Sequence, residues 1–110
     1  MAFDESLADR VRHFLTRRKS VAEKKMFGGL GFLMNGNLLV AVRKDSLLVR
    51  VGPEQNEDAL RELHVSAFQI TGRGTIDGWV VVESEGLEED DQLKDWIDRA
   101  TNYSATLPAK

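Results

Sequence analysis

The segment from Lys24 to Val42, KKMFGGLGFLMNGNLLVAV, constrains the fold more than any other part of the chain. Two apolar runs flank the dipeptide Asn35-Gly36, and both residues of such a turn tolerate positive φ. The pattern predicts a β-hairpin with strands over about 25–34 and 37–43. Lys44-Asp45 predicts a second tight turn, followed by a third strand over about 46–51.

The glycines of this segment match neither of the common phosphate-binding patterns. The dinucleotide pattern G-x-G-x-x-G begins at Gly29 and Gly31 but has Met34 in place of its third glycine. A P-loop needs a lysine and a hydroxyl residue after its last glycine, followed by a helix, whereas a strand and turn are expected here. We therefore expect Gly29 and Gly31 to be strand residues that allow close packing.

A two-residue turn at Asn35-Gly36 predicts which side chains share a face of the sheet. It pairs Phe32 with Leu39 and Gly31 with Val40, and cross-strand partners point to the same side. The face without polar side chains is the expected core, and it comprises Leu33, Leu38, Val51, Gly31, Val40, Val49, Gly29, Val42 and Leu47. The opposite face is expected to carry Leu30, Phe32, Met34, Leu39, Ala41 and Leu48 beside Arg43, Ser46 and Arg50.

The rest of the chain predicts three helices and two further strands. Apolar residues recur at helical spacing over about 4–18 and about 88–103, and Pro53 is suited to begin a helix with Ala59, Leu60 and Leu63 on its apolar face. Short strands are expected over about 67–70 and 79–83, joined by a glycine-containing loop over 71–78. The order α-β-β-β-α-β-β-α predicts an α+β fold, a two-layer sandwich of helices on one face of a five-stranded antiparallel sheet. Residues 1–110 are expected to form one domain.

Composition narrows the classes of function. The 110 residues include no cysteine, and the formal net charge is -3. The acidic N-terminus and the lack of a long apolar run predict a cytoplasmic protein that does not span or bind a membrane. The histidines lie far apart in the sequence, and the serines lack a nucleophile motif. We therefore expect no enzyme, no catalytic residue, no metal site, no cofactor and no small-molecule substrate.

The arginine-bearing face of the sheet is the expected interaction surface. The alternation of the later strands places Phe68, Ile70, Val80 and Val82 inward and Trp79 outward. An apolar patch flanked by arginines is typical of a protein interface, and tryptophan is a common anchor. The expected contact residues for a protein partner or a second copy of the chain are Phe32, Leu39, Leu48, Arg43, Arg50 and Trp79.

Direct binding of nucleic acid is the alternative function. Its expected contacts form the basic cluster Arg17, Arg18, Lys19, Lys24 and Lys25. Such cations hold a phosphate backbone without reading sequence. No aromatic residues are interleaved with the cluster and the pI is about 5.4, so a protein partner is favoured.

Several segments resemble the N-terminal domain of the TfoX/Sxy family. They are MFGGLGF (26–32), MNGNLLVAV (34–42), LLVRV (47–51), HVSAFQITGRGTIDGW (64–79), DQLKDWI (91–97) and YSATLP (103–108). The resemblance implies a bacterial source and a two-layer α/β fold similar to that of secretion chaperones. It supplies no catalytic residue.

The resemblance also implies a regulatory role. Full-length members regulate natural competence and promote transcription together with a cyclic-AMP receptor protein, and they carry a second, C-terminal domain that is not expected here. We therefore expect a non-enzymatic regulatory or interaction module.

Overall fold

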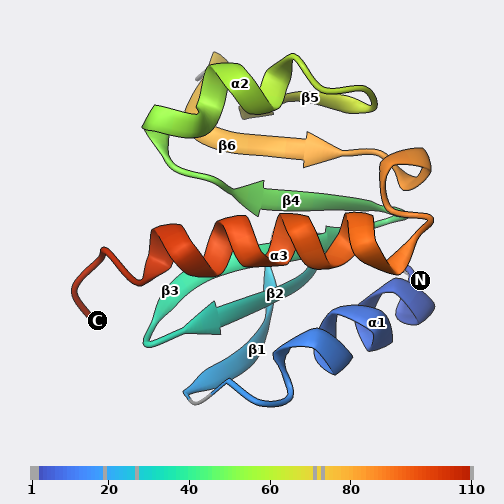
Figure 1. The fold of residues 1–110 in the computed structure, drawn as a ribbon, viewed down its shortest axis with the longest axis vertical. Coiled ribbons are helices and arrows are strands. Elements are labelled where there is room, and N and C mark those ends of the chain that lie inside the picture. The colour runs from blue at the N-terminus through green and yellow to red at the C-terminus, as the bar shows by residue number, and fades with distance from the viewer. Residues whose placement is uncertain (1–2, 19, 27, 71, 73, 110) are drawn as a thin grey trace.

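The computed structural model describes residues 3–18, 20–26, 28–70, 72 and 74–109. These residues form six strands in one antiparallel sheet, in the order β1-β2-β3-β4-β6-β5 (Figure 1). The strands are β1 (Val21–Met26), β2 (Gly29–Met34), β3 (Asn37–Arg43), β4 (Ser46–Arg50), β5 (Val65–Ile70) and β6 (Gly74–Val82). The helices are α1 (Glu5–Leu15), α2 (Asn56–Leu60) and α3 (Asp90–Ser104), with short 3-10 turns at Pro53–Gln55 and Ser84–Gly86.

The α+β class and the antiparallel sheet are confirmed, but the sheet has six strands and not five. The single strand expected over 25–34 is two strands, β1 and β2, which pair from Met26 opposite Gly29 to Val21 opposite Met34. Gly28 lies between them at φ 74°, a conformation that suits glycine. The strand β1 reads VAEKKM. Its three consecutive charged residues interrupt the apolar alternation from which a strand is predicted. The strand β6 begins at Gly74, so the loop expected over 71–78 is shorter.

Side-chain caps explain where α1 and α3 begin. The carboxylate of Asp4 accepts hydrogen bonds from the backbone N–H groups of Ser6 and Leu7 at 2.8 and 3.2 Å, and thus caps α1. At the start of α3, the N–H of Glu89 donates to the side chain of Gln92 at 2.8 Å.

The longest helix among the described residues, α3, has 15 residues. No helix in this part of the chain combines the length and apolar content needed to cross a membrane.

The helix expected from Pro53 is shorter than its apolar pattern indicated. It consists of a 3-10 turn and the five residues of α2, and it ends at Leu60. Ala59 is buried as expected. Leu63 lies beyond the helix with 83% of its surface exposed, so its expected place on a buried face is wrong.

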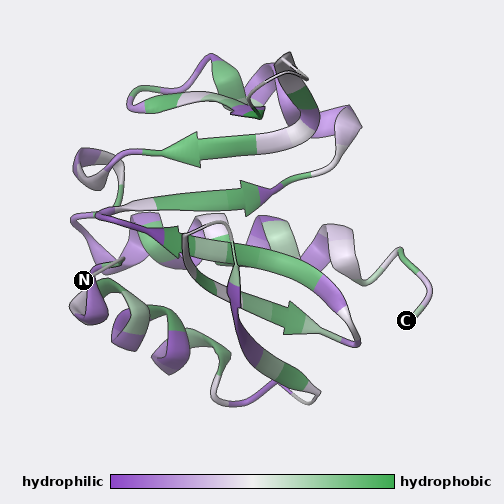
Figure 2. Ribbon diagram, turned by 180° about the vertical axis from the view of Figure 1, so that it is seen from behind, coloured by the Kyte–Doolittle hydropathy of each residue, from purple (hydrophilic) through white to green (hydrophobic). Residues whose placement is uncertain are grey.

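The main core fills the space between the helices and one face of the sheet. The helices contribute Leu7, Val11, Leu15, Leu93, Trp96 and Ile97, and the strands contribute Leu30, Phe32, Leu39, Val40, Val42, Leu47, Val49, Val80 and Val82. Figure 2, viewed from the far side of the sheet, shows that the central strands are apolar and that β1 is largely hydrophilic. The inward positions predicted for Val40, Val42, Leu47, Val49, Val80 and Val82 are confirmed.

A bulge in β3 changes the register on the β2 side. Leu33 pairs with Leu38 as expected, but Phe32 pairs with Val40, which leaves Leu39 as an extra residue. A bulge rotates the side chains beyond it to the other face. Phe32 and Leu39 are therefore buried in the main core, at 1% and 0% exposure, and their expected place on the opposite face is wrong.

The bulge also moves Gly31 away from the helices. Gly31 pairs with Ala41, on the face that the helices leave uncovered. A Cβ at Gly31 would lie 2.7 Å from the sulfur of Met26, and one at Gly29 would lie 1.9 Å from the carbonyl oxygen of Val42. The two glycines therefore allow close contacts within the sheet, and they do not provide space for a helix to approach it.

Candidate functional site

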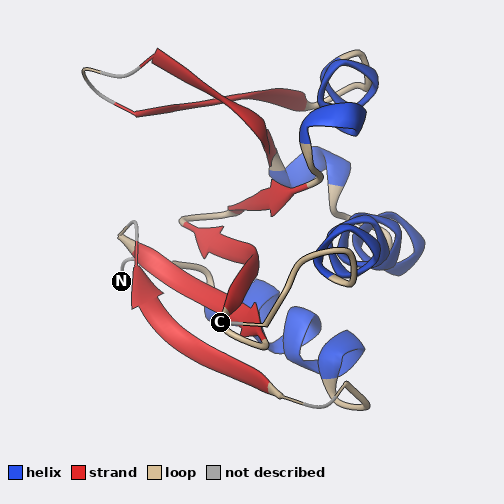
Figure 3. Ribbon diagram, turned by 90° about the vertical axis from the view of Figure 1, so that its left-hand side faces the viewer, coloured by secondary structure: helices blue, strands red, loops and turns tan. Residues whose placement is uncertain are grey.

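The sheet face opposite the helices carries a second apolar cluster. Figure 3 shows the helices on one side of the sheet and the β5–β6 hairpin extending away from them. We call this group the second-face cluster, and it comprises the buried Ala41, Leu48 and Phe68 with the partly buried Ile70, Ile76, Trp79 and Val81 packed against them. It draws on β3, β4, β5 and β6, so four strands must be in place before it exists.

The pairing of β5 with β6 places two of these side chains, because Val65 and Ala67 lie opposite Val82 and Val80 of the main core. Ala67 pairs with Val80, but Gln69 pairs with Thr75, so β6 contains extra residues between these two pairs. Phe68 follows Ala67 and therefore points to the second face by alternation, as does Ile70, so their predicted inward positions are wrong.

The irregular part of β6 is fixed by main-chain bonds at Gly78. This residue has φ 89°. Its carbonyl oxygen accepts from the N–H groups of Val51 and Gly52 at 2.9 and 3.0 Å, and its own N–H donates to the side chain of Asn56 at 3.0 Å. The irregular part of β6 is therefore tied to the end of β4 and the start of α2.

Two arginines lie over the aromatic rings of the cluster. The guanidinium carbon of Arg43 is 5.4 Å from the ring centre of Phe68, and that of Arg50 is 5.1 Å from the ring centre of Trp79. Arg50 is also 5.5 Å from the ring centre of Tyr103, near the end of α3. These separations permit cation–π attraction, which holds the arginine heads at the margin of an apolar surface.

The structure brings together only part of the predicted contact set. Arg43, Arg50 and Trp79 lie on the second face and are partly exposed, whereas Leu48 lies there with 0% exposure. Phe32 and Leu39, in the main core, are not available to a partner. Sequence reasoning missed Phe68 and Tyr103, because the pairing of β5 with β6 places the first and the packing of α3 places the second.

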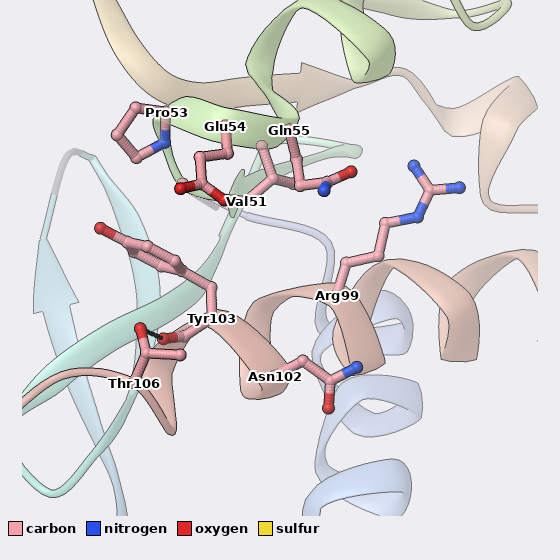
Figure 4. A pocket seen from close by; sticks show the side chains of 9 residues that line it. Val51, Pro53, Glu54, Gln55, Arg99, Asn102, Tyr103 and Thr106 are labelled. Atoms are coloured by element: carbon pink, nitrogen blue, oxygen red, sulfur yellow. Dashed lines mark hydrogen bonds between the residues drawn. The ribbon is translucent and has the colours of Figure 1, made fainter.

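A pocket of about 650 Å³ is lined in part by Tyr103. It lies between the segment that follows β4 and the last turns of α3 (Figure 4). Gly52 forms part of its wall at φ 89°, and a Cβ there would be 2.4 Å from a ring carbon of Tyr103. The bare glycine is therefore what allows the ring to pack against the turn.

Two charged side chains, Glu54 and Arg99, line the pocket, and Arg99 is already paired. Arg99 donates to the carboxylate of Glu62 and lies 2.7 Å from Asp95, and its guanidinium carbon is 4.1 Å from the ring centre of Trp96. The hydrogen bond to Glu62 is the main reason that the pKa of Arg99 is raised. Within the described part of the chain, no group of three or more His, Cys, Asp or Glu side chains is arranged to hold a metal ion.

The basic cluster is spread over different surfaces. Lys24 and Lys25 are consecutive residues of β1 and point to opposite faces of the sheet. Arg18 lies 3.9 Å from Asp98 of α3, and Arg17 is exposed just after α1. Lys19 lies outside the described residues. Nucleic-acid binding through this cluster stays a prediction.

The match to known families covers most of this architecture. The model of the TfoX N-terminal domain matches residues 13–103, from the last turn of α1 to Tyr103. The chain belongs to the TfoX N-terminal domain family. That membership supports a competence-related regulatory module in general, and the family is not a known enzyme family. No curated protein matches the chain.

Proposed function

We propose that this TfoX N-terminal domain is a non-enzymatic regulatory module that binds a protein partner through the second sheet face. The observation that carries the proposal is the placement of Arg43 and Arg50 over the rings of Phe68 and Trp79. Tryptophan and arginine are the residues most often found at the centre of protein interfaces. Arg50 makes no ion pair with a carboxylate of the described residues, so its charge is available to a partner.

The proposed contact surface is narrower than the apolar cluster beneath it. Leu48 and Phe68 are buried and support the surface from below, while Trp79 and Val81 are partly exposed. A fitting partner presents an apolar side chain for the ring of Trp79 and a carboxylate for Arg50. Both contacts come from adjacent strands, because Arg50 pairs with Trp79 in the β4–β6 ladder.

The decisive experiment compares a second-face variant with a charge-matched control. Immobilised wild-type protein, the double variant Arg50→Glu/Trp79→Ala and the control Arg61→Glu are exposed to a lysate of the source bacterium. Arg61 is exposed on the end of α2, where it contacts only Asp58 among the described carboxylates. Proteins captured by the wild type and the control, but not by the double variant, are then purified and titrated.

We expect the double variant to weaken binding of a purified partner by at least about tenfold, because loss of a central interface residue usually costs more than about 1 kcal/mol. Arg61→Glu should leave the affinity within about twofold of wild type. Thermal unfolding of all three proteins shows whether the fold is retained. Capture of the same proteins with the same affinity by the folded double variant would refute this use of the second face.

A further inference from the structure

The two edges of the sheet differ in how they are protected against pairing. The edge strand β1 carries Glu23, Lys24 and Lys25, all exposed, and the guanidinium of Arg12 binds Glu23 at 2.7 and 2.8 Å. Charged residues on an edge strand discourage the addition of another strand. The other edge strand, β5, reads VSAFQI and contains neither a charge nor a proline. Figure 1 shows β1 and β5 at opposite ends of the sheet.

The main chain of β5 offers hydrogen-bonding groups on its outer side. The N–H of Glu83 donates to the carbonyl of His64 at 2.8 Å, immediately before the β5–β6 ladder begins. Antiparallel pairing alternates the direction of these groups along a strand. Ser66 therefore directs its main-chain groups toward β6, and Val65 and Ala67 direct theirs to the free edge. No described strand follows β5 in the order of the sheet.

An exposed leucine precedes this edge strand in the chain. Leu63 precedes β5 by two residues. Among the described residues it is the large hydrophobic residue that is exposed, with 83% of its surface accessible. It supports neither the main core nor the second-face cluster. In strand addition the main chain supplies hydrogen bonds and apolar side chains supply buried area, and Leu63 is an exposed apolar side chain two residues before β5.

We propose that β5 pairs antiparallel with β5 of a second copy of this chain, about a two-fold axis, with Leu63 at the margin of the contact. Identical strands form such a closed, symmetric contact when no like charges oppose each other. The strand β5 meets this condition, whereas β1 does not. Pairing would join the two sheets and place both second-face clusters on one continuous surface. This proposal uses the strand edge and does not depend on partner binding by the second face.

The test measures the mass of the protein in solution as a function of concentration. Sedimentation equilibrium of the wild type is compared with Ser66→Lys, Leu63→Glu and the control Ala22→Lys. All three changed residues are exposed, and Ala22 lies on β1, which already carries two lysines. We expect the wild type and Ala22→Lys to approach twice the 12.3 kDa mass of one chain, and the two β5-side variants to raise the dissociation constant at least about tenfold.

Hydrogen exchange provides the second readout. In the wild type and in Ala22→Lys, the amides of Val65 and Ala67 should exchange more slowly as the protein concentration rises, while in Ser66→Lys their rates should not change. A wild type that stays monomeric up to about 1 mM, the weak end of specific association, would overturn the proposal. So would a dimer that Ser66→Lys and Leu63→Glu leave intact. Neither outcome affects the Arg50 and Trp79 experiment, so failures of the two proposals can be told apart.

Discussion

Replacing Phe32 with alanine tests the register of the central hairpin. Without the bulge at Leu39, Phe32 would lie on the second face, where its truncation would cost little. In the structure it is 1% exposed and packs in the main core. Phe32→Ala removes the apolar contacts of the ring and leaves a cavity that its neighbours fill only in part, at a cost of about 3–5 kcal/mol.

This cost is large compared with the stability of a small domain, which is about 5–15 kcal/mol. At roughly 4 °C per kcal/mol, the melting temperature should fall by about 12–20 °C. Urea unfolding followed by circular dichroism gives the free energy directly. Phe32→Leu, which keeps most of the volume, should cost less than about 1.5 kcal/mol and remains measurable if the alanine variant does not fold.

Leu63→Ala is the matched control, because it also removes an apolar side chain but from a site that is 83% exposed. Its free energy of unfolding should stay within about 0.5 kcal/mol of wild type. The reasoning is refuted if Phe32→Ala also lies within that range, since the Phe32 ring would then not be buried.

Three further changes probe other parts of the chain. Gly52→Ala forces φ 89° on an alanine and puts its Cβ 2.4 Å from a ring carbon of α3, so urea unfolding should show a loss of at least about 2 kcal/mol; an unchanged midpoint contradicts this. The hydrogen bond from Arg12 lowers the pKa of Glu23. The stability that this bond contributes is therefore fully present above pH 4.5 and is lost as the pH falls through the lowered pKa. Unfolding curves should therefore show wild type losing more stability than Glu23→Gln on acidification, and parallel losses would exclude this. DNA binding through Arg17 and Arg18 must weaken steeply with salt, and changing both to alanine should lower the salt slope by about 2; salt-independent binding eliminates the cluster.

The predictable parts of the fold are those where local chemistry decides the geometry. Asn35 and Gly36 have φ 54° and 81°, as a two-residue hairpin turn of this kind requires. Lys44 also has φ 54°, and the pairing of Arg43 with Ser46 confirms the second turn. In α3, the spacing of Leu93, Trp96, Ile97 and Ala100 predicted the buried stripe that the structure contains.

The bulge could not be predicted because both faces of this hairpin are apolar. Alternation normally fixes the register of a strand by exposing polar residues when the strand slips. Here Phe32 and Leu39 could occupy either side without placing a charge in the core. Two apolar solutions therefore fit the pattern, and only the packing of the helices against the sheet selects between them.

The candidate site was predictable where regular alternation along a strand places its residues. Arg43 and Arg50 fall on the second face because the β3–β4 pairing is regular. Phe68 joins them because Ala67 before it lies opposite Val80 of the main core, and Tyr103 comes from a helix distant in sequence. Contacts of that kind depend on the tertiary arrangement, which the spacing of residues in one segment does not contain.

The strand order has a consequence for how the protein is made. Strands β1 to β4 each pair with the next along the chain, so these contacts can form while the chain is emerging from the ribosome. β4 acquires its second neighbour only when β6, residues 74–82, has been synthesised, and the core is not covered until α3 follows. A nascent chain halted before Gly74 therefore presents the main-chain groups of β4 as an open edge, and the final 37 residues close it.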